Sequence, residues 1–123
     1  MTVKAFCFAT SQNDSIAGTA VVRIRAGIQS KASLLQTLAT QLHFPDYFGY
    51  NWDALDECLG DLSWLDVAAV DLYHEDVPLS NRPEEARAYL EVLQGVSSEP
   101  GKVVVRATFP PDVRANVEEL LST

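Results

Sequence analysis

Polar and apolar residues alternate in two short segments near the beginning of the chain. Residues 3–9 (VKAFCFA) and 19–25 (TAVVRIR) both follow this period of two, which is typical of β-strands. A polar cluster at residues 11–15 (SQNDS) lies between them and indicates a turn. The pattern therefore predicts two strands that are able to pair as a hairpin with a long loop.

Leucines at helical spacing predict the first helix at about residues 33–43, with Ser33 as its N-cap. Pro45 ends this helix, because the residue before a proline is pushed out of the helical region. A second helix is expected at about residues 52–61, where Asn51 is suited to cap the first turn.

Two more strands and two more helices follow. The apolar run at 67–73 predicts a strand covered on both faces, and residues 102–108 (KVVVRAT) predict another. Pro83 and the acids after it open a third helix that is expected to end near Gly95. A short amphipathic helix is expected after Pro110.

Strands separated by helices favour right-handed crossovers and a parallel sheet. The prediction is an α/β fold with a small three-stranded parallel sheet, formed by residues of about 20–25, 67–73 and 103–108, with helices packed on it. The strand at 3–9 adds an extra N-terminal edge strand, expected to be antiparallel, and the C-terminal helix is a second addition. Residues 1–123 are expected to form a single domain.

Length and composition agree with one globular domain. The chain has 123 residues, of which 47% are hydrophobic and 21% charged, close to the globular average. No apolar run approaches the ~20 residues that cross a bilayer, and the N-terminus is a poor signal peptide. Cys7 and Cys58 form no CxxC pair, which favours structural, reduced thiols and a cytoplasmic location.

The charge is distributed unevenly. The net charge is −8, and residues 32–81 contain nine acids and no lysine or arginine, whereas the rest holds eight acids and nine bases. This argues against direct binding of nucleic acid, which requires basic residues. Two interpretations remain: a solvated face that aids solubility, or a surface that attracts a basic partner.

The second helix has two distinct faces. Its apolar residues share one stripe at 100° per residue; they are Trp52, Leu55, Leu59 and Leu62. Asp53, Asp56 and Glu57 share the opposite side, where like charges repel by a few tenths of a kcal/mol each. The helix dipole offsets this for Asp53 but little for Glu57. A mildly unfavourable arrangement of this kind is expected at a functional surface.

The loop before this helix is rich in aromatic residues. Phe44, Phe48 and Trp52 are expected in the core, and Tyr47 and Tyr50 on the surface. Tyrosine beside carboxylates is a composition favoured at protein interfaces.

Residues 44–59 (FPDYFGYNWDALDECL) resemble the signature of the barstar family of intracellular ribonuclease inhibitors, and the resemblance extends over about residues 20–108. It implies a barstar-like fold in which the loop and second helix block the basic active site of a small microbial ribonuclease, with acids in place of RNA phosphates. The best-known complex of that family is itself a standard example of electrostatic steering.

The resemblance also implies a set of partner-binding residues. These are Tyr47, Gly49, Tyr50, Asn51, Asp53, Asp56 and Glu57. Glu57 corresponds to the central acid of the family, an aspartate in its best-known member. Two positions depart from that member: Asp56 replaces an interface tryptophan, and Gly95 falls near another interface acid.

The expected protein is therefore not an enzyme. It is expected to be a bacterial, antitoxin-like inhibitor, monomeric when free, that binds a basic extracellular-type ribonuclease or a similar basic toxin. No cofactor, metal, nucleic acid or membrane is expected to bind.

Three alternatives stay open. The first is an enzyme with Asp53 and Glu57 as general acid and base, although His43 and His74 lie in no catalytic motif. The second is a site in which the same acids hold a hard cation, although acids on one straight helix diverge. The strongest alternative is a barstar-like acidic module that neutralises or regulates a basic partner other than a ribonuclease.

Overall fold

The computed structural model describes residues 6–8, 18–98 and 103–122 of the chain. The strands are β1 (Phe6–Phe8), β2 (Thr19–Ile24), β3 (Ala69–His74) and β4 (Val104–Phe109). The helices are α1 (Lys31–Leu42), α2 (Trp52–Asp61), α3 (Pro83–Ser98) and α4 (Arg114–Ser122), with a 3₁₀ turn η1 (Pro111–Val113) before the last. The predicted α/β fold class, with its extra edge strand and C-terminal helix, is confirmed.

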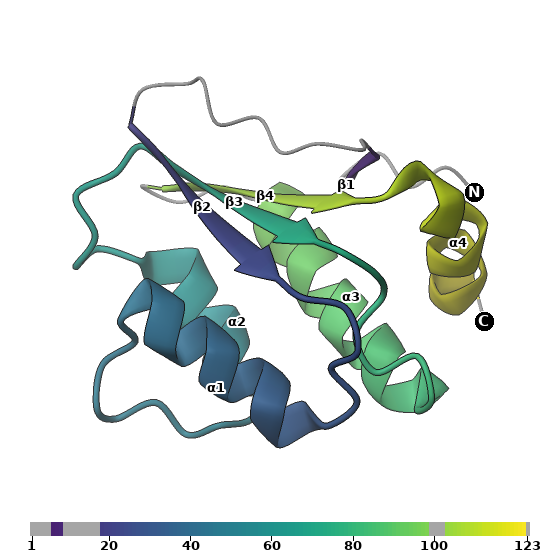
Figure 1. The fold of residues 1–123 in the computed structure, drawn as a ribbon. Coiled ribbons are helices and arrows are strands. Elements are labelled where there is room, and N and C mark those ends of the chain that lie inside the picture. Colours follow the sequence, from purple (N-terminus) through teal and green to yellow (C-terminus); the bar gives the residue numbers. More distant parts are fainter. Residues whose placement is uncertain (1–5, 9–17, 99–102, 123) are drawn as a thin grey trace.

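The four strands form one parallel sheet in the order β1-β4-β3-β2. β3 is central, pairing through Ala69 with Thr19 of β2 and with Val104 of β4. All six of its residues are buried, as the continuous apolar run predicted. Helices α1, α2 and α3 lie on one face of the sheet (Figure 1), as expected when successive right-handed crossovers run in the same direction.

The first strand corrects the sequence prediction. It was expected to be antiparallel and able to form a hairpin with the strand at 19–25, but β1 runs parallel to β4, at the opposite edge from β2. This pairing brings Phe6 and Phe8 within 5.3 and 6.3 Å of the Phe109 ring. Cys7 faces the other way and is exposed, so it lacks the packed surroundings expected of the structural thiol that the sequence predicted.

The first helix begins earlier than its leucines suggested. Ser30, not Ser33, is the N-cap: its hydroxyl oxygen accepts a hydrogen bond from the Ser33 backbone N–H at 3.1 Å. The predicted leucine stripe is confirmed, because all four side chains are at most 1% exposed; they are Leu34, Leu35, Leu38 and Leu42. The helix ends at Leu42, and its C-cap His43 has a left-handed backbone (φ 54°).

The last two helices pack against each other. α3 continues through Gly95 and ends at Ser98, close to the predicted end, and a Cβ at Gly95 would meet nothing within 4 Å. In α4, Val117 is fully buried, and Leu120 and Leu121 are partly buried against the core, as is Val113 of η1. The C-terminal helix thus buries the face that its periodicity predicted.

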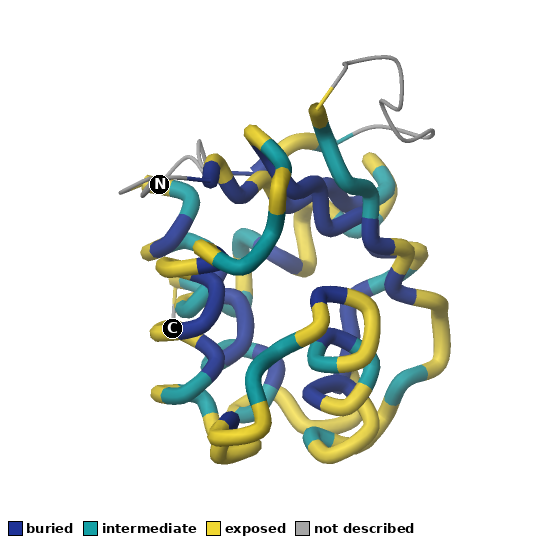
Figure 2. The backbone as a smooth tube through the Cα atoms, turned by 90° about the vertical axis from the view of Figure 1, so that its left-hand side faces the viewer, coloured by how far each residue is buried: buried dark blue, intermediate teal, exposed yellow. Residues whose placement is uncertain are grey.

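Buried residues lie mainly in the strands and on the inner sides of the helices, while exposed residues lie mainly in the loops and on the outer helix turns (Figure 2). Among the described residues, no helix combines the length and apolar character needed to cross a membrane.

Candidate partner-binding site

The aromatic loop before α2 is held by one buried ring. Phe48 is 6% exposed, and its ring packs against Phe44 at 4.8 Å and Tyr50 at 4.7 Å between centroids. Tyr47 and Tyr50 are 76% and 47% exposed, as predicted from the sequence. The packed Phe48 ring therefore anchors a loop in which Tyr47 and Tyr50 are exposed to solvent.

Two of the predicted core aromatics lie at the margin of the core. Phe44 and Trp52 are partly buried and packed against it, so only Phe48 of the three is a core residue. The centroid of the Trp52 ring lies 6.1 Å from that of the Tyr89 ring, and the Lys31 ammonium lies 5.0 Å from the Trp52 centroid. Trp52 thus lies at the boundary between the core and the surface, in the first turn of α2.

Asn51 ties the loop to the helix. Its Oδ1 accepts a hydrogen bond from the Ala54 backbone N–H at 2.8 Å, and its Nδ2 donates to the Gly49 carbonyl oxygen at 3.3 Å. A Cβ at Gly49 would come within 3.2 Å of this Nδ2, so a side chain at this position would crowd the capping amide. Tyr50 has a positive φ of 53°, a conformation that costs energy for a non-glycine residue and often occurs at functional sites.

Replacing Asn51 with alanine is expected to lower the free energy of unfolding by about 1 kcal/mol, because the N–H of Ala54 loses its acceptor. Urea denaturation followed by far-ultraviolet circular dichroism measures the change. Asn51→Ser is the matched control, since serine also caps helices and should retain most of the stability. Equal stability of the alanine and serine variants would contradict this role for the cap.

The two predicted faces of α2 are present. Leu55, Cys58 and Leu59 are buried, while Asp53, Asp56 and Glu57 are exposed. Leu62 follows as the left-handed C-cap and is fully buried. Burial raises the pKa of the Cys58 thiol, and the nearby carboxylates of Glu57 and Asp61 raise it further. This thiol is therefore protonated at neutral pH and serves packing, as expected.

The acids of α2 are not neutralised from within the described part of the chain. The ion pairs found there join Arg23 to Glu75, Arg87 to Glu91 and Arg114 to Glu118. Asp53, Asp56 and Glu57 enter none of them. Their charges are free to meet cations on another molecule.

The structure adds α3 residues that the sequence analysis missed. A hollow lies between α2 and α3, with α3 contributing Ala88, Glu91 and Val92. These residues share one face of α3 by their spacing, but nothing in the local pattern indicates that this face meets α2. Gly95, which the resemblance aligned near an interface acid, is exposed and has no side chain to offer.

The two histidines lie elsewhere in the fold. His43 caps α1, and His74 is fully buried. Its Nδ1–H donates to the Thr108 carbonyl oxygen at 3.0 Å, and its Nε2 accepts from the Tyr89 hydroxyl at 2.6 Å, roles assigned from the partners. In the described ranges, no group of three or more His, Cys, Asp or Glu side chains is placed to hold a metal ion.

Fold and site together define a small parallel α/β protein that presents exposed tyrosines from one loop and, from the helix after it, carboxylates with no ion pair to a described residue. The family model described as Barstar (barnase inhibitor) matches residues 19–109. Because this match covers more than half of the 123 residues, the chain belongs to the barstar family, as its resemblance predicted. The matched segment begins with β2 and ends with β4. A search of curated proteins found no match.

Proposed function

We propose that this protein inhibits a small, basic, microbial ribonuclease by covering its active site with the loop at residues 44–51 and the exposed side of α2. The observation that carries the proposal is that Asp53, Asp56 and Glu57 are exposed without an ion pair to any described residue. They stand on a helix within the segment that matches an inhibitor family.

The mechanism is charge mimicry. A ribonuclease must place Arg, Lys or His in its cleft to bind RNA phosphates, and the carboxylates of α2 meet the same groups. Bidentate contacts with arginine provide the pairing that a buried carboxylate requires. Substrate is then excluded because the cleft is filled, and no chemical step on the inhibitor is needed.

The local structure prepares the site for binding. The Asn51 cap sets the first turn of α2, and Phe48 fixes the loop that carries Tyr47 and Tyr50. A surface already ordered before binding loses less conformational entropy when the complex forms. Tyr47 and Tyr50 contribute apolar contact around the carboxylates, a common role for tyrosine at interfaces.

The protein is proposed to act as a monomer in the bacterial cytoplasm, protecting the cell from a ribonuclease destined for export. Reduced thiols at Cys7 and Cys58 suit that compartment.

Titration into a panel of small microbial ribonucleases tests the proposal, with RNA cleavage as the readout. Inhibition of at least one enzyme at a one-to-one ratio is expected. The association rate should fall as salt rises from about 0.01 to 0.15 M, because the Debye length shrinks from ~30 to ~8 Å. Folded protein that inhibits none of the panel would contradict the proposal. Capture of a basic protein without ribonuclease activity would favour the alternative acidic module.

A further inference from the structure

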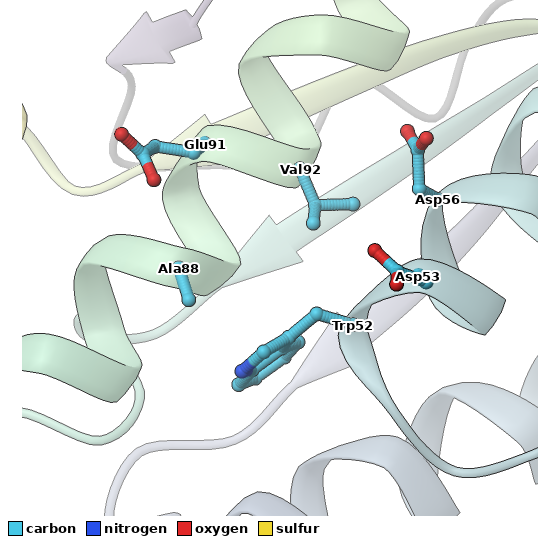
Figure 3. A pocket seen from close by; sticks show the side chains of 6 residues that line it. All are labelled: Trp52, Asp53, Asp56, Ala88, Glu91 and Val92. Atoms are coloured by element: carbon cyan, nitrogen blue, oxygen red, sulfur yellow. The ribbon is translucent and has the colours of Figure 1, made fainter.

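Trp52, the first residue of α2, contacts residues of two other helices. It follows the capping residue Asn51 and precedes Asp53. Its ring centroid lies 6.1 Å from that of Tyr89 in α3, within the range of aromatic pairs. The ammonium of Lys31, at the start of α1, lies 5.0 Å from the same centroid. The indole projects from α2 toward α3 (Figure 3). The orientation of the first turn of α2 is therefore coupled to both α1 and α3.

Tyr89 is itself held by the sheet. It is fully buried, and its hydroxyl donates to Nε2 of His74 in β3 at 2.6 Å. The His74 ring in turn stacks on Phe109 of β4, with 4.1 Å between centroids. Satisfied buried polar contacts of this kind rigidify a core and specify one packing. The Tyr89 ring thus gives Trp52 a fixed surface on the α3 side.

Lys31 occupies a position that is unfavourable for its own helix. It is the first residue of α1, whose first turn contains no acid, and a cation at a helix N-terminus opposes the macrodipole. It forms no ion pair with a described residue. Its ammonium lies instead over the Trp52 ring, where a cation–π contact is favourable. A local choice that opposes helix stability indicates a role in another part of the molecule.

We propose that Trp52 is a positioning residue for the partner-binding surface, and that Lys31 and Tyr89 act through it. Their contacts fix the first turn of α2, and with it Asp53, before a partner binds. Binding then loses less conformational entropy. The inference rests on the proposed function and deepens it, because it adds three residues that order the surface without belonging to the exposed acidic side of α2.

Lys31→Met tests the proposal, because positioning predicts a result opposite in sign to that expected from charge. The variant keeps the length of the side chain and removes a cation from a helix N-terminus, so the melting temperature should stay equal or rise. It also makes the protein more acidic, which by steering alone would strengthen binding to a basic ribonuclease. Positioning predicts instead that the inhibition constant rises about threefold. Lys31→Arg keeps a cation over the ring and should restore wild-type inhibition.

Arg25→Met is the matched control for the loss of one positive charge. Arg25 is exposed and lines a separate hollow with Thr37 and Gln41 of α1. It forms no ion pair with a described residue. Inhibition by this variant should equal or exceed that by the wild type, because the charge is removed without loss of the contact on Trp52.

A second readout needs no ribonuclease. In the ¹⁵N-labelled protein, the heteronuclear Overhauser effect of the Trp52 indole N–H reports the rigidity of the ring on the picosecond-to-nanosecond timescale. Lys31→Met and Tyr89→Phe should each lower it, since the first removes the cation and the second frees the ring from its hydrogen bond. The indole of Trp64 donates to the Leu42 carbonyl oxygen at 2.9 Å and is the internal control, which should not change.

The outcomes separate this inference from the proposed function. An unchanged Trp52 signal in Lys31→Met, or an arginine variant that inhibits as weakly as the methionine variant, would overturn the positioning role. Stronger inhibition by Lys31→Met than by the wild type would also overturn it. The proposed function survives these results, because it is tested by wild-type inhibition of the panel. If the wild type inhibits no ribonuclease, the proposed function fails, and the Trp52 signal still decides whether these contacts fix the first turn of α2.

Discussion

Glu57→Ala is expected to raise the inhibition constant for the target ribonuclease by about 30-fold or more, corresponding to roughly 2 kcal/mol. Glu57 is exposed, lies one turn after Asp53 on the same side of α2, and has no ion pair with a described residue. Truncation removes its carboxylate and leaves the cation that it meets desolvated and unpaired in the complex.

Conservative variants at Glu57 separate charge from shape. Glu57→Gln keeps the size but not the charge, so it should lose nearly as much inhibition as alanine. Glu57→Asp keeps the charge with a shorter reach and should retain a larger part of the inhibition. The matched control is Glu119→Ala, because Glu119 is exposed on α4, outside the family match.

Inhibition constants of the Glu57 and Glu119 variants are compared by RNA cleavage at fixed salt, and thermal unfolding confirms that each variant folds. A loss of inhibition by Glu119→Ala as large as that by Glu57→Ala would show that only net charge matters. That result would contradict a specific role for Glu57.

Acid is expected to destabilise the folded protein through His74. This residue is fully buried, its ring is stacked 4.1 Å from Phe109, and both ring nitrogens are hydrogen-bonded. Burial lowers the pKa of His74 from 6.5 to about 4, because the interior disfavours the imidazolium form.

The direction of the pH effect follows from linkage. The unfolded state, with the ordinary pKa of 6.5, binds a proton more tightly than the folded state with a pKa of about 4. The stabilising contribution is therefore fully present above pH 6.5 and is lost as pH falls toward 4. Over this window the loss from His74 amounts to about 3 kcal/mol, at ~1.4 kcal/mol for each pH unit.

Urea denaturation at several pH values between 4 and 7 measures this loss. Carboxylates also titrate at the acid end, so the wild type is compared with His74→Gln, which should be less stable at pH 7 but show a shallower dependence on pH. Tyr89→Phe keeps the histidine while removing the hydroxyl that donates to it, and should retain a pH-dependent loss. Parallel curves for the wild type and His74→Gln would contradict the assignment.

Local patterns were sufficient for the features that depend on nearby residues. The helix at Trp52–Asp61, its Asn51 cap and its two faces were all predicted, because capping and 3.6-residue periodicity act within a few positions. The exposure of Tyr47 and Tyr50 was also predicted. The first helix was misplaced at its start because Ser30 and Ser33 are both suitable capping residues, and only the backbone conformation distinguishes them.

The features that depend on distant residues required the tertiary structure. The alternation of polar and apolar residues identified β1 as a strand, but it does not indicate which strand β1 pairs with. That partner is β4, about a hundred positions away in the sequence. The same limit applies to the hollow, where Trp52 meets Val92 only because α2 packs on α3. By itself the sequence determined which residues face outward from the second helix, since side-chain direction follows from local geometry. Only long-range packing decided which elements stand beside them.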